Sequence, residues 1–303
     1  MKNEIKRRDF LKLTGLGIGV VFSSRLGLAC SPAMATEYGT RNDSPEFYFL
    51  QMSDTHWGFT GDQANPDAKG TLIKAVNAVN ALEQQPDFIF FTGDLTHTTD
   101  NPKERRARMA EFKDIVSRLK VKDVKFTPGE HDASLDNGEA YQEFFGETHY
   151  TFEHKGIQFI VLDNVSDPKA SIGDEQLGWL KSALDRFDKN QRIVVFTHRP
   201  LFDLYPEWDW ATRDGAQAIE ILMPYNNVTV FYGHIHQENH HMTGHIPHHS
   251  AKSLMFPLPP PGSQPKRTPV LWNPNEPYKG LGFREVEAKN DSVSIAEFPV
   301  MKG

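Results

Sequence analysis

The sequence predicts an α/β protein whose strands pair largely in parallel. Six short runs rich in β-branched and aromatic residues have the length and composition of buried strands. Segments with apolar residues at helical spacing separate most of these runs. Such an alternation of strand and helix is typical of an α/β fold with substantial parallel pairing. The expected strands are residues 47–52, 88–91, 124–127, 157–162, 193–197 and 228–232.

Three helices are predicted between these strands, because apolar residues recur on one face of each segment. Their core-facing residues are Leu72, Ile73, Val76, Val79 and Leu82 in the first helix, Met109, Phe112, Ile115, Val116 and Leu119 in the second, and Leu177, Leu180 and Leu184 in the third, which begins at Asp174. The end of the chain follows a different pattern. Residues 281–286 and 292–298 flank the turn sequence KND and predict an antiparallel hairpin.

The first 35 residues are predicted to be a targeting segment that is not part of the fold. Residues 6–12 (KRRDFLK) hold a twin arginine, a moderately apolar run follows at 13–28, and residues 33–35 (AMA) give a small-x-small cleavage pattern. The apolar run is too short and too polar for a stable membrane span. The segment resembles a bacterial twin-arginine export signal, which the twin-arginine export machinery recognises. A basic amphipathic helix is the alternative interpretation.

Residues 36–303 are long enough for one large domain, which we expect to be periplasmic or otherwise exported. The formal net charge of −7 argues against a general binder of nucleic acid or anionic membranes. Cys30 is the only cysteine, and lipidation there is an alternative to cleavage after Ala35. If cleavage follows Ala35, the mature chain has neither a disulfide nor a thiolate metal site.

Acidic residues and histidines follow five of the expected strands. The stretches are SDTH at 53–56, TGD at 92–94, PGEHD at 128–132, His198, and GHIH at 233–236. The carboxyl ends of parallel strands meet at one edge of a sheet, where ligands bind in α/β proteins. Acid-x-His triplets also occur at 147–149 and 238–240, so the position after a strand carries the signal and the triplet alone does not. The sequence therefore predicts a metal site at this edge.

The order of these residues resembles that of the calcineurin-like metallophosphoesterases. In that family D-x-H, G-D, G-N-H-D/E, H and G-H-x-H each follow a strand, and the resemblance runs from residue 47 to the C-terminal hairpin. It implies a four-layer α/β/β/α sandwich with two metal ions at one edge. Carried over by motif, the ligands of the first metal are Asp54, His56 and His236, those of the second are Glu130, His198 and His234, and Asp94 bridges the two.

The same resemblance implies a hydrolase that acts on phosphodiesters or phosphomonoesters of small molecules. Its imidazole and carboxylate ligands suit Zn²⁺, Fe or Mn²⁺, and two such ions clamp a phosphate and activate a water. His131 would lie near the leaving oxygen as a proton donor or charge stabiliser. Asp132 would orient the imidazole of His131. A non-catalytic metal-binding protein of the cell envelope, built on the same fold, is the alternative.

Glu130 departs from the family pattern, because asparagine usually occupies this position. The acidic ligands then bring three negative charges instead of two. We expect the second metal to bind more tightly, or the site to favour a harder ion such as Mn²⁺ or Fe³⁺. We also expect the Lewis acidity of that metal to fall. The alternative is that Glu130 turns away and a water takes its place.

Further histidines lie near the motif residues. His97 follows Asp94 by three positions and could point into the same pocket. Five more are expected in a loop: His240, His241, His245, His248 and His249. This loop could load metal, form a wall of the substrate pocket, or hold histidines that only make hydrogen bonds.

Arg199 and an aromatic group also allow two interpretations each. Arg199 could meet a substrate phosphate or form a salt bridge. Tyr205, Trp208 and Trp210 could stack on a base or sugar ring, or cap the core. The proline-rich residues 257–269 are predicted to form an extended surface connection.

Overall fold

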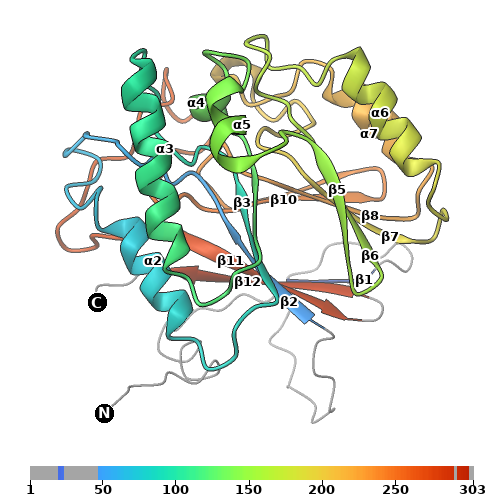
Figure 1. The fold of residues 1–303 in the computed structure, drawn as a ribbon, viewed down its shortest axis with the longest axis horizontal. Coiled ribbons are helices and arrows are strands. Elements are labelled where there is room, and N and C mark those ends of the chain that lie inside the picture. The colour runs from blue at the N-terminus through green and yellow to red at the C-terminus, as the bar shows by residue number, and fades with distance from the viewer. Residues whose placement is uncertain (1–19, 24–46, 290–291, 300–303) are drawn as a thin grey trace.

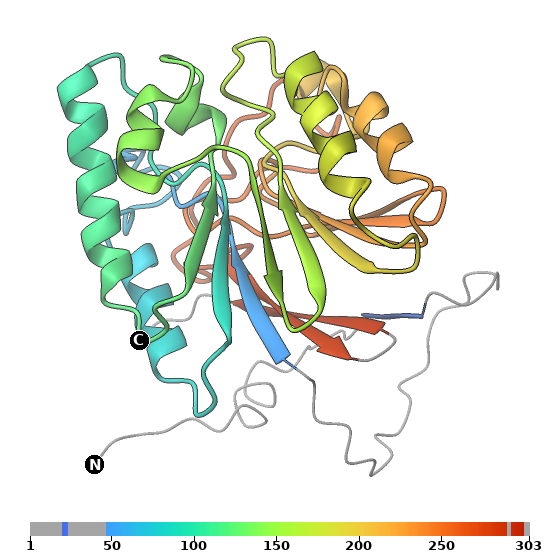
Figure 2. The same ribbon diagram turned by 45° about the vertical axis from the view of Figure 1, so that its right-hand side comes forward.

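The structure is a computed structural model that describes residues 20–23, 47–289 and 292–299. In this part of the chain two six-stranded sheets pack face to face, and helices cover the outer face of each sheet (Figures 1 and 2). The strand order is β1-β12-β11-β2-β3-β4 in the first sheet and β5-β6-β7-β8-β10-β9 in the second. The predicted four-layer α/β/β/α sandwich is therefore confirmed.

The first sheet has a parallel half and an antiparallel half. Strands β2, β3 and β4 are parallel, and β11 pairs antiparallel with both β2 and β12, which confirms the predicted hairpin. The strands are β1 (Val20–Ser23), β2 (Phe47–Met52), β3 (Phe88–Thr92), β4 (Val124–Thr127), β11 (Gly282–Lys289) and β12 (Ser292–Pro299). The helices in this half of the chain are α2 (Thr71–Asn80), α3 (Pro102–Ser117), α4 (Glu130–Ala133) and α5 (Glu139–Phe145).

The second sheet is parallel at its centre, where β6, β7, β8 and β10 pair in parallel, and antiparallel at both edges. Its strands are β5 (Tyr150–His154), β6 (Ile157–Val161), β7 (Arg192–Phe196), β8 (Asn227–Tyr232), β9 (Asn239–Thr243) and β10 (Ile246–Ser250). Helices α6 (Asp174–Leu184) and α7 (Gly215–Leu222) lie on its outer side, and a 3₁₀ turn η1 (Pro206–Trp208) precedes α7 (Figure 1).

Local sequence explains where the elements begin and why the strands look uniformly apolar. Asn101 caps α3, because its side chain accepts hydrogen bonds from two backbone N–H groups of the first turn, and Pro102 occupies the first helical position. The strands β2 and β3 are buried along their whole length. A strand that is covered on both faces reads as a continuous apolar run, which is why these strands were predictable.

Phenylalanines fill the space between the two sheets. Phe90 of β3 stacks on Phe196 of β7 with ring centroids 3.6 Å apart. Phe49 of β2 stacks on Phe88 and meets Phe231 of β8 edge to face at 5.8 Å. Such pairs contribute about 0.5–1.5 kcal/mol each beyond their buried area. The aromatic layer therefore holds the two sheets in register and fixes how their strand ends meet.

The histidine-rich segment is an antiparallel hairpin, β9–β10, and the prediction of a loop there was wrong. His248 and His249 are buried at 0% and 2% exposure, and β10 pairs in parallel with β8 inside the sheet. Burial lowers the pKa of His248 to about 3 and that of His249 to about 2, so both imidazoles are neutral at pH 7. Polar residue types concealed the strand because these imidazoles occupy positions that apolar side chains usually fill.

The predicted export signal falls on residues 1–35, which lie outside the described residues except for Val20–Ser23. These four residues form β1, which pairs antiparallel with β12, so this part of the segment belongs to the first sheet and not outside the fold as predicted. Within the described residues, none of the helices has the length and apolar character needed to cross a membrane.

Candidate metal centre

The seven predicted ligands come together where strands of both sheets end. The first sheet supplies four of them from the segments after β2, β3 and β4, and the second sheet supplies three after β7 and β8 (Figure 1). Groups of these side chains place potential ligand atoms within 4.8 Å of one another. The residues are Asp54, His56, Asp94, Glu130, His198, His234 and His236.

The first group is buried and consists of Asp54, His56 and His236. Nε2 of His236 lies 3.4 Å from Oδ1 of Asp54 and 3.1 Å from Nε2 of His56. These distances place two imidazole nitrogens and a carboxylate oxygen around one point, as a cation site requires.

The second group consists of Glu130, His198 and His234. Oε2 of Glu130 lies 2.8 Å from Nε2 of His198, and its Oε1 lies 2.9 Å from Nδ1 of His234. Glu130 therefore faces the centre, and the alternative in which it turns away does not describe this structure. Oδ2 of Asp94 lies 3.5 Å from Nε2 of His56 and 3.5 Å from Nε2 of His198. Asp94 thus stands between the two groups.

Three of the four histidines direct one ring nitrogen outward to a backbone carbonyl. Nδ1 of His198 lies 2.6 Å from the carbonyl oxygen of Thr92, and Nδ1 of His236 lies 2.7 Å from that of Phe256. Nε2 of His234 lies 3.1 Å from the carbonyl oxygen of Asp209. Because a carbonyl only accepts, the outward Nδ1 of His198 and that of His236 carry a proton, and the inward Nε2 of each can offer its lone pair to a metal ion.

This arrangement is typical of histidines that ligate metals. Nε2 of His198 is buried and lies 2.8 Å from Oε2 of Glu130 and 3.5 Å from Oδ2 of Asp94. Two carboxylates that face one buried nitrogen require a cation or a proton between them. The donor set thus fits two cations of the kind that imidazole and carboxylate bind.

The electric field of the site also favours cations. Burial and the charge of Glu130 raise the pKa of Asp94, but the imidazoles of His131, His198 and His56 outweigh them and hold it below its ordinary value. Burial opposes ionisation of Glu130 too, yet His234 and His198 hold its pKa well below its usual range. Both carboxylates are therefore ionised. Burying so much negative charge is costly unless positive charge accompanies it.

Five of the seven candidate ligands have left-handed backbone conformations, with φ between 40° and 66°. Non-glycine residues adopt this region rarely, and each instance costs about 1–3 kcal/mol. They are Asp54, His56, Asp94, His234 and His236. Strain on this scale concentrates at functional sites, because the turn that aims the side chain inward is needed for more than stability.

Close backbone approach explains two of the motif glycines. A Cβ on Gly129 would lie 2.0 Å from the backbone nitrogen of Asp94, and one on Gly93 would lie 2.3 Å from Nδ1 of His198. Gly93 also has φ +88°. Either side chain would displace a candidate ligand, so glycine is required by the site at both positions.

Residues 47–238 match the family model described as Calcineurin-like phosphoesterase. The chain belongs to this family. The match contains all seven candidate ligands and stops before β9, so the hairpin β9–β10 and the connection that follows it lie outside the matched region.

Individual members of the family show similarity over part of their length. The chain is 29% identical over 162 residues to a probable glycerophosphodiester phosphodiesterase of Arcobacter nitrofigilis. The aligned region covers 50% of this chain and 56% of that protein. It is 30% identical over 180 residues to the serine/threonine-protein phosphatase CPPED1 of Mus musculus, covering 52% of this chain and 57% of that protein. The chain thus matches little more than half of the length of these relatives.

Solved structures share the fold at low sequence identity. A dimetal phosphatase from Danio rerio superimposes with a TM-score of 0.60 at 14% identity, over 86% of this chain and 98% of that one. A purple acid phosphatase from yellow lupin gives a TM-score of 0.58 at 14% identity, over 80% of this chain and 49% of that one. At such identities the likeness concerns the fold alone.

His131 lies beside the candidate ligands but is not oriented as predicted. Its Nε2 is 3.9 Å from Oδ2 of Asp94, and its ring packs against that of His56. The backbone N–H of Thr98 donates a hydrogen bond to Nδ1 of His131 at 3.1 Å. Because Nδ1 accepts, the neutral imidazole carries its proton on Nε2. The residue that orients His131 is therefore Thr98, which sequence reasoning missed, since a backbone donor leaves no side-chain signal.

Asp132 braces two loops and does not orient His131, so that prediction was wrong. Its carboxylate accepts hydrogen bonds from the backbone N–H groups of Leu95, Thr96 and Gly129 at 2.8–3.0 Å, and from the hydroxyl of Thr96. Asp132 is the third residue of the short helix α4 and turns back to cap its start. The helical turn thus directs the carboxylate away from the preceding imidazole.

The other candidates divide between the site and the core. Nδ1 of His97 lies 3.4 Å from Nδ1 of His56, so His97 joins the site. Arg199 is buried and forms a bidentate ion pair with Asp209, so the salt-bridge interpretation holds and its end is not available to substrate. Trp208 and Trp210 are buried in the core of the second sheet, with Tyr205 packed against it.

Arg267 is a residue at the site that sequence reasoning missed. Its Nη1 lies 3.2 Å from Nε2 of His234, and its Nη2 lies 3.7 Å from Oδ2 of Asp209. It belongs to the proline-rich connection at residues 257–269, which has no helix or strand but contains turns and bends at residues 261–266, so the segment is irregular and not uniformly extended as predicted. No spacing in such a segment predicts where it touches the sheets.

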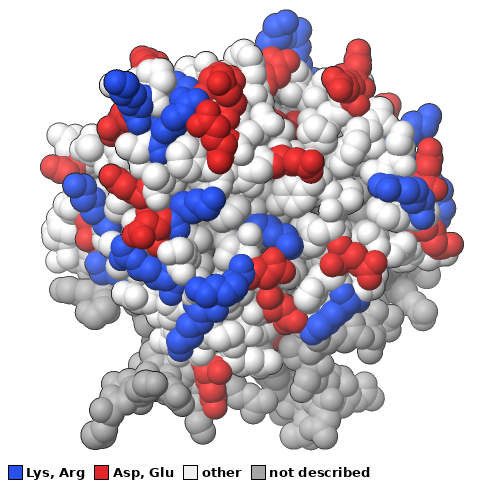
Figure 3. All heavy atoms as spheres, viewed as in Figure 1, with Lys and Arg blue, Asp and Glu red and all other residues white. Residues whose placement is uncertain are grey.

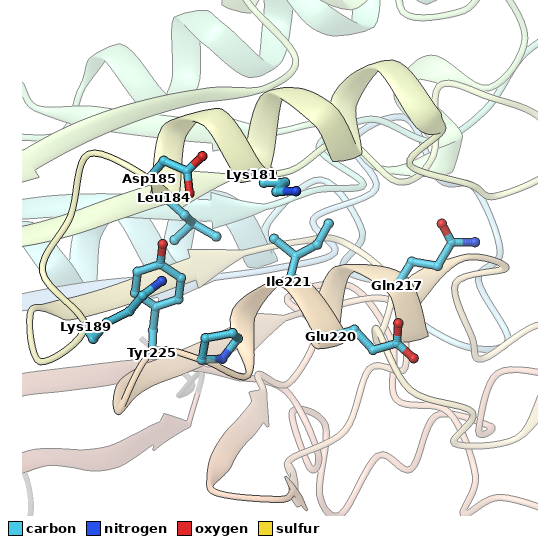
Figure 4. Close-up of a pocket in the computed structure, with 9 residues that line it drawn as sticks. Lys181, Leu184, Asp185, Lys189, Gln217, Glu220, Ile221 and Tyr225 are labelled. Atoms are coloured by element: carbon cyan, nitrogen blue, oxygen red, sulfur yellow. The ribbon is translucent and has the colours of Figure 1, made fainter.

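Outside the candidate metal centre, the described surface gives little indication of a second binding site. Basic and acidic side chains are interspersed over the face in Figure 3. A groove of ≈ 540 Å³ lies between α6 and α7, where Lys181 and Lys189 are accompanied by Asp185 and Glu220 (Figure 4). None of the candidate ligands lines it.

Proposed function

We propose that this chain is an exported metallophosphoesterase that hydrolyses phosphate esters of small molecules with a water activated between two metal ions. The observation that carries the proposal is the position of Asp94. One of its oxygens lies 3.5 Å from an inward histidine nitrogen of each ligand group. A carboxylate placed in this way can serve two cations at once.

The residues that would hold the metals follow from the two groups. Asp54, His56 and His236 would bind the first ion, and Glu130, His198 and His234 the second, with Asp94 shared. When bound, two such ions lower the pKa of a water and stabilise negative charge on the phosphate. The outward hydrogen bonds to backbone carbonyls hold the imidazoles in place for this purpose.

His131 is suited to stabilise charge on the leaving oxygen. Its Nδ1 already accepts the Thr98 N–H, so a proton on that nitrogen would break the hydrogen bond. The ring therefore offers its Nε2–H as the hydrogen-bond donor toward the leaving oxygen. Its side chain is 25% exposed, which leaves room for a substrate beside it.

The relatives bear on the substrate and not on the route of export. Their names include a probable glycerophosphodiester phosphodiesterase, a probable cyclic nucleotide phosphodiesterase and a protein phosphatase, so both diesters and monoesters occur among them. The twin-arginine sequence at residues 6–12 supports delivery to the periplasm by the twin-arginine machinery.

The test is hydrolysis of bis(4-nitrophenyl) phosphate and 4-nitrophenyl phosphate by the purified protein, loaded in turn with Mn²⁺, Fe²⁺ and Zn²⁺. Asp94→Asn is the control and is expected to lower turnover at least about a hundredfold, because it removes the shared carboxylate oxygen. Two bound metals without turnover of either ester would favour a non-catalytic metal-binding protein. Export is tested separately, by whether Arg7→Lys with Arg8→Lys retains the protein in the cytoplasm.

A further inference from the structure

Glu130 places a carboxylate in the second ligand group, and a buried arginine lies behind it. We propose that Arg199 is a positioning residue that offsets the charge of Glu130 and thereby sets how tightly the second metal binds. This inference rests on the proposed metal centre.

The geometry of Arg199 carries the inference. Its side chain is 4% exposed, and its Nε lies 4.0 Å from Oε2 of Glu130. That Nε is buried and has no hydrogen-bond partner among the described residues. A guanidinium withdrawn from water needs negative charge around it, and Glu130 supplies a carboxylate on the side that faces the metal centre.

Asp209 connects Arg199 to the other side of the second ligand group. Its carboxylate binds both terminal nitrogens of Arg199, and a bidentate pair of this kind fixes the plane of the guanidinium. Its backbone carbonyl accepts the Nε2–H of His234 at 3.1 Å. Asp209 itself has a left-handed φ of 65°. One strained loop residue thus holds both the partner of Glu130 and the ligand His234.

The consequence is that Glu130 and Arg199 act on the second metal in opposite directions. The carboxylate of Glu130 attracts the cation, whereas the buried guanidinium behind it repels the cation, although Asp209 offsets part of that positive charge. Glu130→Asn should therefore weaken metal binding at the second site, and Arg199→Gln should tighten it. Because the two charge interactions add, the affinity of the double variant should lie between those of the two single variants.

The experiment is a double-mutant cycle read out by metal binding. Mn²⁺ is titrated into the metal-free wild type, Glu130→Asn, Arg199→Gln and the double variant, in competition with a chromophoric chelator. Because charges a few ångströms apart interact strongly even at an effective dielectric constant of about 20, we expect Arg199→Gln to tighten the second site at least about tenfold and Glu130→Asn to weaken it at least about tenfold, with the double variant between them. An affinity of Arg199→Gln for the second metal within about threefold of the wild type would overturn the inference.

The chain offers a matched control in Arg105. This arginine is 6% exposed, pairs with Asp136 at 2.6 Å, and also has a buried Nε without a hydrogen-bond partner among the described residues. It is not among the groups of candidate ligands. Arg105→Gln should leave the affinity for the second metal within about threefold of the wild type, whereas an equal gain in Arg105→Gln and Arg199→Gln would show a general effect of removing a buried arginine.

Two further variants keep the inference testable if Arg199→Gln does not fold. Arg199→Met replaces the guanidinium by an apolar chain of similar length and should tighten the second site as Arg199→Gln does. Arg199→Lys keeps the charge and should leave the affinity near that of the wild type; a tighter site with lysine would count against the role of charge. Failure of the wild type to bind any metal would refute the proposed function, whereas normal binding with an unchanged second site in Arg199→Gln and Arg199→Met would refute only the role of Arg199.

Discussion

The substitution Asp132→Asn separates a bracing role from a catalytic one. Asp132 is 1% exposed, and its two oxygens together accept four hydrogen bonds. In asparagine one oxygen becomes an NH₂ group. If that group faces Leu95 and Gly129, two buried N–H groups lose their acceptor. If that group faces Thr96, only the backbone N–H of Thr96 loses its acceptor, because the Thr96 hydroxyl can then accept a hydrogen bond from the NH₂ group.

The protein will adopt the cheaper orientation, so one buried N–H is left unsatisfied at a cost of about 1–3 kcal/mol. We therefore expect Asp132→Asn to lower the free energy of unfolding by about 1–3 kcal/mol, measured by urea denaturation of the metal-free protein at pH 7. Asp123→Asn, at an exposed ion pair with Lys125, is the control and should change it by less than about 0.5 kcal/mol.

The pH profile of hydrolysis should keep its shape in Asp132→Asn, because the carboxylate does not contact His131. A stability change below about 0.5 kcal/mol, together with a shifted pH profile, would refute this reasoning. It would show that Asp132 acts through the imidazole after all.

Three other predictions concern histidines. Burial lowers the pKa of His248 to about 3 and of His249 to about 2, so below pH 6.5 the unfolded chain takes up protons that the folded one does not. The free energy of unfolding should be highest above pH 6.5 and fall by about 2 kcal/mol per histidine between pH 6.5 and pH 5. In His248→Leu this fall should be smaller by the contribution of one histidine, as measured by unfolding at both pH values. A pH dependence equal to that of the wild type would contradict the prediction. His131→Asn should lower kcat by about 10²–10⁴ with little change in bound metal, and a change in metal content alone would exclude the assigned role. His97→Leu should weaken binding of the first metal about 10–100-fold, because it removes the group beside Nδ1 of His56, and unchanged affinity in a chelator titration would count against it.

The sequence predicted elements and ligands wherever a local pattern carries the information. Strands such as Phe88–Thr92 are buried on both faces and read as apolar runs, and α6 shows its core side in Leu177, Leu180 and Leu184. The candidate ligands were found because each directly follows a strand, so that chain order gives spatial position once the sheets form.

What the sequence did not predict depends on contacts between distant segments. Strand β10 (Ile246–Ser250) carries polar residues at buried positions, and its pairing with β8 is visible only in three dimensions. The Thr98 N–H that orients His131 and the approach of Arg267 to His234 depend on how loops pack. Asp132 was assigned to the wrong neighbour because adjacency in sequence does not give direction inside a helical turn.

Both proposed ions would draw their ligands from both sheets. Asp54 and His56 belong to one layer and His236 to the other, while Glu130 reaches across to His198 and His234. Each cation would consequently act as a cross-link between two halves that aromatic stacking otherwise holds together. Removal of the ions by a chelator would therefore weaken the contact between the two sheets at the edge that carries the site. An ion present at a hundred times its Kd would raise the free energy of unfolding by about 2.7 kcal/mol. Metal binding would thus affect the stability of the fold as well as its chemistry.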